Sequence, residues 1–306
     1  MKPPPLVSIV IVAMNDEDYI ARTIESAVAQ DYPSLEVHVQ HGAAGTDRTL
    51  DIVKTYRAIR WASEHDTGFP DGANRGLRAT TGEIVIVEGG DDLLLPGAAS
   101  ALVAALGRHE NAGFAYGDID YIDSTGRSFF KVAGKPFDLD EMFWSNLVAT
   151  QSVAFRRSAL AVTGSYRTDV INADWDLFIR LGARFPAVYV PGVLAQYRVH
   201  DRSNTLRNMA KMAWSMCAVA DGALADPVTI GGLKRGRERA FAGSRLTAAL
   251  LSVLANDRPS AWRHFRQAIS AYPRALVTRH GLMALASLGL GARLYARMRR
   301  RGRRPG

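Results

Sequence analysis

The chain has 306 residues, enough for one large α/β domain and a smaller appended region, and its composition (47% hydrophobic, 22% charged) is that of an ordinary globular protein. Its single cysteine, Cys217, excludes an intrachain disulfide, and no apolar run reaches the roughly 18 residues of a membrane-spanning helix. The N-terminal stretch lacks the apolar core and cleavage site of a signal peptide, so we expect a cytoplasmic protein.

The net charge of +8 is distributed unevenly along the chain. Residues 1–205 carry 19 Lys and Arg against 26 Asp and Glu, whereas residues 206–306 carry 19 against 4. The basic character therefore belongs to the C-terminal third, which we expect to contact an anionic partner or the acidic part of the chain.

The first 90 residues alternate between expected strands and helices. An apolar, β-branched run at 7–12 predicts a buried strand, and apolar residues at helical spacing predict a helix from Ile20 to Val28. Further strands are expected at 35–39 and 59–61, with a helix between them that ends at Tyr56. This βαβαβ succession indicates parallel strands joined by right-handed crossovers.

The middle of the chain continues the α/β pattern. After a polar loop at 64–76 and a short helix that ends at Thr81-Gly82, we expect a strand at 83–87. The further expected elements are a helix from about Pro96 to His109, strands at 113–118, 128–132 and 151–155, a helix that begins near Asn172, and extended segments at 188–190 and 194–200. From about Asn208 the pattern becomes helical, at 208–225, 234–256, 259–271 and 274–298.

The stretch from Glu83 to Asp92 carries the strongest chemical signal. Its strand ends in Gly89-Gly90 and is followed at once by Asp91 and Asp92, at the edge where open α/β sheets bind ligands. Adjacent carboxylates are suitable oxygen ligands for Mg²⁺ or Mn²⁺. An equally good interpretation is that the two aspartates serve only to begin the next helix, since Pro96 resembles a helix N1 residue.

Five motifs occur in a characteristic order: Ser8 to Asn15; Gly42 to Thr49; Glu64 to Gly68 with Asp71, Asn74, Gly76, Thr81 and Gly82; Gly90-Asp91-Asp92; and Asp174-Trp175-Asp176-Leu177 with Tyr197-Arg198-Val199-His200. This order resembles glycosyltransferase family 2 over about residues 6–205. The resemblance implies the GT-A nucleotide-diphospho-sugar transferase fold for residues 1–205, with a mainly parallel central sheet and helices on both faces. Residues 206–306 would form a helical C-terminal region with a basic tail.

Several positions depart from the family's pattern. His41 stands where the family usually has an Asp that contacts the nucleotide base, and Met14 where an aromatic residue is common. Glu88 stands where the family often has an apolar residue, and Gly89 where it often has Asp or Asn. These departures affect the expected donor more than the expected reaction class.

The resemblance implies a divalent metal, Mn²⁺ or Mg²⁺, bound together with a nucleotide-diphospho-sugar donor. Asp92 is then the direct metal ligand, and Asp91 would contact the ribose or the ion. His200 would bind the diphosphate or complete the metal shell, although a lone His is more often a hydrogen-bonded structural residue.

By the same resemblance, Asp174 is the base that takes a proton from the acceptor hydroxyl. Its structural alternative is an N-cap of a helix that begins at Trp175, a role compatible with the first. Asp176 is expected to support the structure or bind the acceptor. With this one base, and no second carboxylate in the matched motifs that suggests a covalent intermediate, the reaction should invert the anomeric configuration.

The remaining candidate site residues surround the donor. Asp66 and Asp71 would edge the donor pocket and Asn74 would support it, although a solvated loop fits either Asp nearly as well. His41 could bind the nucleobase or be an exposed turn residue. Arg198 belongs to the closing motif and has a surface ion pair as its alternative.

The C-terminal third ends in an apolar segment at 281–292, followed by seven arginines between Arg293 and Arg304. An apolar helix with an arginine-rich end suits an anionic membrane surface, which would place the protein peripherally on the inner face of the cell membrane. A core-packing helix with a solvated tail explains the pattern equally well. Nucleic-acid binding is not expected, because the basic charge lacks interleaved aromatics and a base-reading motif.

The sequence therefore predicts an inverting, metal-dependent glycosyltransferase that acts on a glycan or a lipid-linked acceptor in cell-surface polysaccharide or glycolipid synthesis. A nucleotidyltransferase that makes sugar nucleotides is one alternative, although residues 13–17 are acidic where that class usually has a glycine-rich, basic loop. The other alternative is a non-catalytic scaffold with the same fold.

Overall fold

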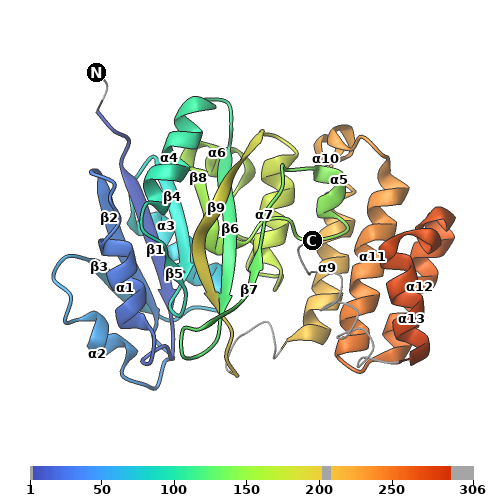
Figure 1. Cartoon of the computed structure of the whole chain (residues 1–306), viewed down its shortest axis with the longest axis horizontal. Coiled ribbons are helices and arrows are strands. Elements are labelled where there is room, and N and C mark those ends of the chain that lie inside the picture. Colours follow the sequence, from blue (N-terminus) through green and yellow to red (C-terminus); the bar gives the residue numbers. More distant parts are fainter. Residues whose placement is uncertain (1–2, 202–207, 291–306) are drawn as a thin grey trace. The chain divides into compact units, whose positions relative to one another are not determined.

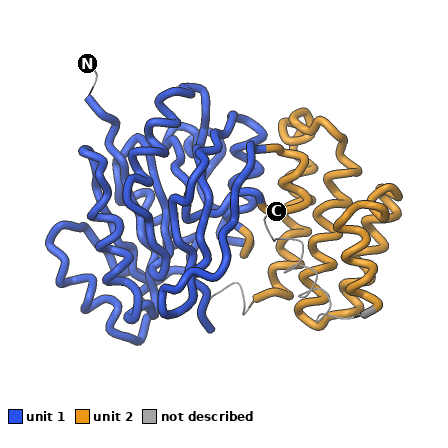
Figure 2. The backbone as a smooth tube through the Cα atoms, viewed as in Figure 1, with its two compact units in different colours: residues 1–137, 147–169, 173–201 blue, residues 138–146, 170–172, 202–306 orange. Residues whose placement is uncertain are grey.

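The computed structural model describes residues 3–201 and 208–290, and the basic tail after Leu290 lies outside this range. The chain falls into two compact units (Figure 2). Unit 1 comprises Met1–Phe137, Leu147–Asp169 and Ala173–Asp201. Unit 2 comprises Asp138–Asn146, Val170–Asn172 and Arg202–Gly306. Two short segments from the middle of the sequence thus belong with the C-terminal helices.

Unit 1 is built on one mixed sheet (Figure 1). In the described residues its strand order is β3-β2-β1-β4-β8-β6-β9-β5, with β7 paired to β6. The first four strands in this order are parallel to one another, and β8 is antiparallel to both of its neighbours. The strands are β1 Val7–Ala13, β2 Leu35–Gly42, β3 Arg60–Glu64, β4 Ile84–Gly89, β5 Leu93–Leu94, β6 Phe114–Ile122, β7 Ser128–Val132, β8 Val153–Arg156 and β9 Ala187–Arg198.

Helices cover both faces of this sheet because its central strands are apolar on both sides. On one face, Ile9 and Ile11 of β1 share a buried core with α1 (Ile20–Val28), α2 (Thr49–Val53) and α4 (Ala98–Arg108). On the other face lie α3 (Phe69–Ala79), α6 (Arg157–Thr163) and α7 (Ala173–Gly182). There, Gly72 and Gly76 of α3 lie directly on Val12 and Val10, so a side chain at either glycine would collide with β1.

The register of the parallel strands brings their carboxyl ends to one edge. Val12 pairs with Gly89, Ala13 with His41, and Gly42 with Glu64. The segments that follow β1, β2, β3 and β4 therefore meet at the edge where open α/β sheets bind ligands.

Unit 2 is helical in its described residues. Its longest helix, α11 (Arg237–Leu254), packs against α9 (Met209–Ala223), α12 (Arg258–Ala271) and α13 (Arg279–Leu290). The buried carboxylate of Asp140 accepts hydrogen bonds from the backbone N–H groups of Lys234 and Arg235, at 2.8 and 2.9 Å. The shorter elements of unit 2 are α5 Leu139–Met142, α10 Pro227–Gly232 and the 3₁₀ helix η2 Pro273–Val277.

The predicted fold class is confirmed, with a small number of local corrections. The two extended segments expected near the end of unit 1 form the single strand β9, which runs through Pro191 with a shift in register. The helix expected from about Pro96 begins at Ala98, and β5 lies between it and Asp92. The interpretation that Asp91 and Asp92 only open this helix is therefore wrong. Among the described residues, no helix combines the length and apolar content needed to cross a bilayer.

Candidate active site

Asp92 lies at the carboxyl end of β4 and is almost completely buried, with 2% of its surface exposed. Its Oδ1 accepts a hydrogen bond from the backbone N–H of Arg198 at 2.9 Å, and its Oδ2 accepts one from the side-chain amide of Gln151 at 3.0 Å. These donors come from β9 and from the 3₁₀ helix η1 (Thr150–Ser152). Two segments that are distant in the chain thus fix the carboxylate.

Asp91 is paired with His200, whose Nε2 lies 2.9 Å from Asp91 Oδ2. The Arg198 side chain is fully buried beside this pair, where its Nε donates to the backbone carbonyl of Asp91 at 2.9 Å. The ring of Tyr19, in the turn before α1, lies 4.7 Å from the Arg198 guanidinium and 5.1 Å from the His200 ring. The predicted residues Asp91, Asp92, Arg198 and His200 are therefore brought together, and Arg198 is not a surface ion pair.

The carboxyl groups of Glu88, Asp91 and Asp92 lie close together at this end of β4, and those of Glu88 and Asp92 are buried. Burial and the neighbouring charge of Asp91 raise the pKa of Asp92 well above its usual value. Burial also raises the pKa of Glu88 well above its usual value, and Asp92 and Asp91 add to this effect. Within the described part of the chain, neither carboxylate oxygen of Glu88 has a hydrogen-bond partner.

The two adjacent carboxylates converge on Gly89. A Cβ atom at residue 89 would lie 2.9 Å from Asp91 Oδ1 and 3.0 Å from Asp92 Oδ2, so one oxygen of each aspartate lies beside the Gly89 backbone. A divalent cation fits this donor set, because Mg²⁺ and Mn²⁺ accept one or two protein carboxylates together with phosphate oxygens. The described residues contain no group of three or more His, Cys, Asp or Glu side chains arranged to hold a metal by themselves.

Gly89→Ala is expected to weaken binding of Mn²⁺ with a nucleotide sugar by at least about tenfold, because the new methyl group would push both carboxylates apart. Isothermal titration of the variant with each ligand pair measures this. The control is Gly107→Ala in α4, where no atom lies within 4 Å of the new Cβ. Helix propensity should stabilise that control by about 0.5–1 kcal/mol. Equal binding by wild type and Gly89→Ala would contradict the convergence of the two carboxylates.

Asp174 is linked to Asp92 through two consecutive residues. Thr150 Oγ1 donates to Asp174 Oδ2 at 3.3 Å, and the next residue, Gln151, donates to Asp92. Asp174 is the second residue of α7, so it lies inside the first turn rather than at the N-cap position. Burial raises the pKa of Asp174, and hydrogen bonds from Trp175 and Thr150 oppose this shift. A raised pKa suits a group that must accept a proton.

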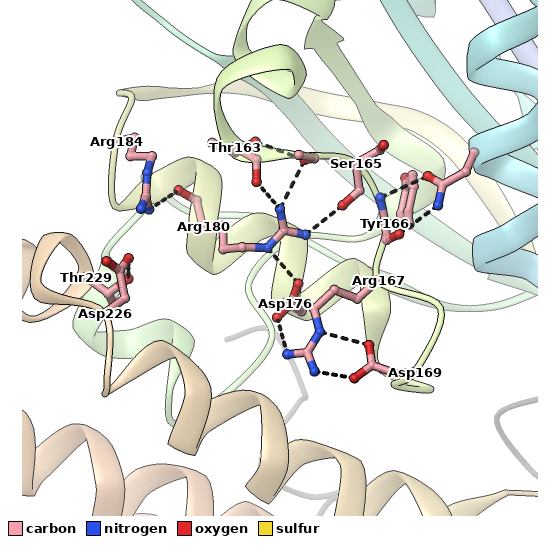
Figure 3. Close-up of polar contacts among 12 residues, drawn as sticks. Thr163, Ser165, Tyr166, Arg167, Asp169, Asp176, Arg180, Arg184, Asp226 and Thr229 are labelled. Carbon is pink, nitrogen blue, oxygen red and sulfur yellow. Dashed lines mark hydrogen bonds and ion pairs between the residues drawn. The ribbon is translucent and has the colours of Figure 1, made fainter.

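The carboxylate of Asp176, two residues after Asp174, accepts hydrogen bonds from two arginines (Figure 3). Arg180 Nε donates to Asp176 Oδ2 at 2.7 Å, and Arg167 Nη1 donates to Asp176 Oδ1 at 3.4 Å. The other nitrogens of Arg180 donate to the carbonyl groups of Thr163, Gly164 and Ser165. Asp176 thus holds the guanidinium that anchors the segment between α6 and α7.

The same segment is attached to α3 through Asn74. The Asn74 amide donates to the Tyr166 carbonyl at 2.7 Å and accepts from the Tyr166 N–H at 3.0 Å. The Tyr166 hydroxyl is buried without a hydrogen-bond partner among the described residues. Burial and the nearby charges of Asp174 and Glu88 raise its pKa. Asn74 therefore attaches the segment between α6 and α7, which lies near Asp174, to α3.

Asp176→Asn is expected to lower the free energy of unfolding by about 1–3 kcal/mol, because Arg180 and Arg167 would lose their buried anionic partner. Urea unfolding followed by circular dichroism measures the change. Asp169→Asn is the matched control. The carboxylate of Asp169 also binds Arg167, but 67% of the Asp169 side chain is exposed. We expect it to cost less than about 1 kcal/mol. Equal losses in the two variants would contradict the anchoring function of Asp176.

His41 is the penultimate residue of β2, and Asp66 follows the neighbouring strand β3. His41 is buried rather than an exposed turn residue, and its Nδ1 lies 2.9 Å from Ser63 Oγ. Burial lowers the pKa of His41, although Asp47 and Asp66 oppose the shift. Asp66 Oδ1 accepts from the backbone N–H of Gly68 at 2.9 Å, and its Oδ2 points toward the backbone of Gly42.

Asp71 lies in the first turn of α3. Its Oδ2 accepts from the Thr67 N–H at 3.2 Å and lies 3.4 Å from Arg75 Nε. These contacts give Asp71 a structural function at the start of the helix.

Sequence reasoning missed several residues of the site. Gln151 is predicted only as the first residue of a strand, and no function is predicted for Thr150 or Tyr19. One signal was present in the sequence. Glu88 ends an otherwise apolar strand, and a carboxylate in that position is expected to be buried, close to the residues that follow the strand, Gly89 to Asp92.

Comparisons with known proteins agree with this architecture. The signature of the family described as Glycosyl transferase family 2 matches residues 8–161, about half of the chain. A relative named PGL/p-HBAD biosynthesis glycosyltransferase, from Mycobacterium tuberculosis, is 30% identical over 203 residues, which cover 63% of this chain and 77% of the relative. Chondroitin synthase of Escherichia coli is 25% identical over 214 residues, which cover 68% of this chain and 31% of that protein.

Solved structures of glycosyltransferases share the fold. Residues 1–349 of S. aureus TarS, in complex with UDP-GlcNAc, superpose with a TM-score of 0.66 at 18% identity, covering 97% of this chain and 92% of that chain. The mannosyltransferase PcManGT from Pyrobaculum calidifontis, in complex with GDP-Man and Mn²⁺, superposes with a TM-score of 0.58 at 18% identity, covering 94% and 88%. The chain therefore belongs to glycosyltransferase family 2 and is a glycosyltransferase with the GT-A fold.

Proposed function

We propose that this glycosyltransferase is metal-dependent and inverting, and that it moves a sugar from a nucleotide-diphospho-sugar to a hydroxyl of a glycan or lipid-linked acceptor. One observation carries the proposal. The carboxylates of Asp91 and Asp92 converge at Gly89, and two consecutive residues of η1 connect Asp92 to Asp174. A cation site and a proton acceptor would thus lie side by side at the ligand-binding edge of the sheet.

Asp92 and Asp91 would hold a Mn²⁺ or Mg²⁺ ion, and His200 would orient Asp91 or complete the shell. When bound, such an ion would offset the negative charge that develops on the departing diphosphate. Arg198 adds a fixed positive charge beside the same carboxylates. Around the donor, His41 would face the nucleobase, Asp66 and Asp71 would edge the pocket, and Asn74 would support its wall.

Asp174 would accept the proton from the acceptor hydroxyl as the acceptor oxygen attacks the anomeric carbon. The bond from that carbon to the diphosphate breaks on the opposite side, so the anomeric configuration inverts. Asp176 is unsuited to a second chemical function, because Arg167 and Arg180 occupy its two oxygens. Asp174, which accepts from Thr150, is then the carboxylate of this motif that remains for chemistry, which supports a single displacement over a covalent intermediate.

The related proteins support a nucleotide-sugar donor and a surface glycan or glycolipid as product. TarS and PcManGT were solved with UDP-GlcNAc and with GDP-Man and Mn²⁺, and the relatives' names refer to PGL/p-HBAD biosynthesis and to chondroitin synthesis. A lipid-linked acceptor would bring the cytoplasmic enzyme to the inner face of the cell membrane.

A thermal-shift series with UDP-, GDP- and dTDP-sugars, each with Mn²⁺ and with EDTA, tests the donor and the metal together. We expect one nucleotide to raise Tm by several degrees with Mn²⁺ and much less with EDTA, followed by slow, Mn²⁺-dependent hydrolysis of the matching donor. Release of pyrophosphate from a nucleoside triphosphate and a sugar phosphate would instead indicate a nucleotidyltransferase. A Tm unaffected by every donor would favour the non-catalytic scaffold.

A further inference from the structure

The C-terminal part of the chain is strongly and uniformly basic. Residues 258–306 contain 12 arginines and no Asp, Glu or Lys. Five of the arginines, at positions 258, 263, 266, 274 and 279, lie in the described elements α12, η2 and α13. Positive charge is therefore built into the folded helices, independently of the basic tail.

The three elements pack together at the end of unit 2 (Figure 1). Arg258 at the start of α12 donates to the carbonyl of Leu288 near the end of α13, at 3.2 Å, which indicates an antiparallel arrangement. His264 and Phe265 of α12 and Leu288 of α13 are buried. By contrast, Trp262, Arg263 and Arg266 of α12 and Arg279, Leu282 and Leu285 of α13 are exposed.

The exposed residues of these elements include large apolar side chains as well as arginines. The exposed fractions are 76% for Val277, 55% for Leu282, 42% for Leu285 and 39% for Trp262. Leu282 and Leu285 are one helical turn apart, whereas Ala284 and Leu288 on the other side of α13 are buried. The apolar side of α13 that packing does not use is thus open to water.

Among the described residues, Arg266, Arg274 and Arg279 form no ion pair, whereas Arg263 donates to Ser260 Oγ at 3.1 Å and helps to lower the pKa of Asp257. Among residues 208–290, ion pairs are made by Arg235, Arg239 and Arg245. Arg263, Arg266, Arg274 and Arg279 take part in none of them. The Arg266 guanidinium instead lies 6.0 Å from the Trp262 ring. Exposed aliphatic side chains, an exposed Trp and arginines outside ion pairs, on three elements whose own residues include no Asp or Glu, are the combination found in protein surfaces that bind the lipid headgroup region.

We propose that this set of residues, hereafter the α12–α13 surface, binds an anionic lipid bilayer. Its members are Trp262, Arg263, Arg266, Arg274, Val277, Arg279, Leu282 and Leu285. The aliphatic groups and the Trp ring enter the headgroup boundary, while the arginines pair with lipid phosphates. The surface would hold the enzyme where the lipid-linked acceptor of the proposed function resides, but membrane binding itself requires no sugar transfer.

Vesicle co-sedimentation of the full-length chain tests the charge requirement. We expect binding to vesicles of 70% phosphatidylcholine and 30% phosphatidylglycerol, little binding to pure phosphatidylcholine, and weaker binding at 0.5 M salt. Replacing Arg263, Arg266, Arg274 and Arg279 with Gln should lower the partition coefficient on the order of a hundredfold or more at low salt. The matched control replaces Arg22, Arg57, Arg78 and Arg108, exposed residues of unit 1, and should bind like the wild type.

Fluorescence quenching by brominated acyl chains tests insertion. The wild type should be quenched, and Trp262→Phe should lose most of the quenching, whereas Trp61→Phe, which alters a ring with 42% exposure in unit 1, should not. Leu282→Ser with Leu285→Ser should reduce binding, and Val162→Ser, at a residue with 66% exposure in unit 1, should not. Neutralising the seven tail arginines with Gln should weaken binding but leave the Trp262-dependent quenching.

Three results would overturn the proposal. The first is wild-type binding by the quadruple arginine variant, and the second is quenching that does not depend on Trp262. The third is a dimer, seen by sedimentation velocity without vesicles, that the Leu282 and Leu285 changes abolish, which would assign the surface to a second copy of the chain. Donor hydrolysis is assayed in solution without vesicles, so failure of membrane binding and failure of the proposed function are distinguished.

Discussion

Asp92→Asn is expected to lower kcat/KM for sugar transfer at least about 10³-fold while the protein remains folded. Amide oxygen is a weaker cation ligand than carboxylate, and a loss of about 4 kcal/mol of transition-state stabilisation gives this factor. Transfer from the donor identified by thermal shift, measured over a range of Mn²⁺ concentrations, provides the test. Mn²⁺ and donor together should also raise the Tm of the wild type but not that of the variant.

The stability of this variant provides an internal control. The folded state raises the pKa of Asp92 above its unfolded value, so Asp92 lowers the free energy of unfolding at any pH above that unfolded value, which includes pH 7–8. The neutral amide removes this cost and can still accept the hydrogen bond from Arg198 N–H. Without ligands, Asp92→Asn should therefore unfold at the same temperature as the wild type or higher. Asp51→Asn, a surface change, is the charge control. Full activity of Asp92→Asn would contradict the proposed metal site.

Asp174→Asn is expected to reduce kcat by about 10²–10⁴-fold, the usual contribution of a positioned general base, with donor affinity little changed. Affinity should persist because Asp174 contacts Thr150, and Gln151 can still bind Asp92. Single-turnover transfer and donor titration, measured separately, distinguish the two effects. A loss of donor affinity equal to the loss in kcat would indicate a structural rather than a catalytic function.

The pH dependence gives a second test of Asp174. A base must be ionised to act, and the pKa of Asp174 is raised in the folded protein. The rate of the wild type should therefore rise with pH and level off only above the ordinary range of an aspartate, about pH 4. With Mn²⁺ and donor saturating at every pH, so that protonation of Asp92 does not limit the rate, residual activity in Asp174→Asn should lack this acidic limb, whereas Asp169→Asn should retain it.

The parallel half of the fold was predictable because its strands carry their own signal. The apolar, β-branched runs of β1 and β4 can be buried only inside a sheet covered on both faces, and the glycines and aspartates after β4 mark the edge where it ends. The family resemblance then supplied the order of the remaining elements. The membership of residues 138–146 and 170–172 in unit 2 leaves no such pattern, because it depends on distant partners such as Lys234 and Arg235.

The candidate site was predictable where chemistry is local and unpredictable where it is long-range. Asp91 and Asp92 are adjacent in sequence, and their carboxylates meet at Gly89. The contacts that fix them come from Gln151 and Arg198, 59 and 106 residues away in the chain. Nothing in the local sequence around Gln151 distinguishes an amide that points to Asp92 from one that points to solvent.

The bond from residue 198 to Asp92 is made by a main-chain amide, and this affects how a mutational scan of the site should be interpreted. Substituting Ala or Lys at position 198 removes the guanidinium but leaves the amide in place. Side-chain substitutions at residue 198 would therefore measure only the contacts of the guanidinium, and would not detect the hydrogen bond from its backbone N–H to Asp92. Proline, which has no amide hydrogen, is the one standard residue that would remove this backbone hydrogen bond.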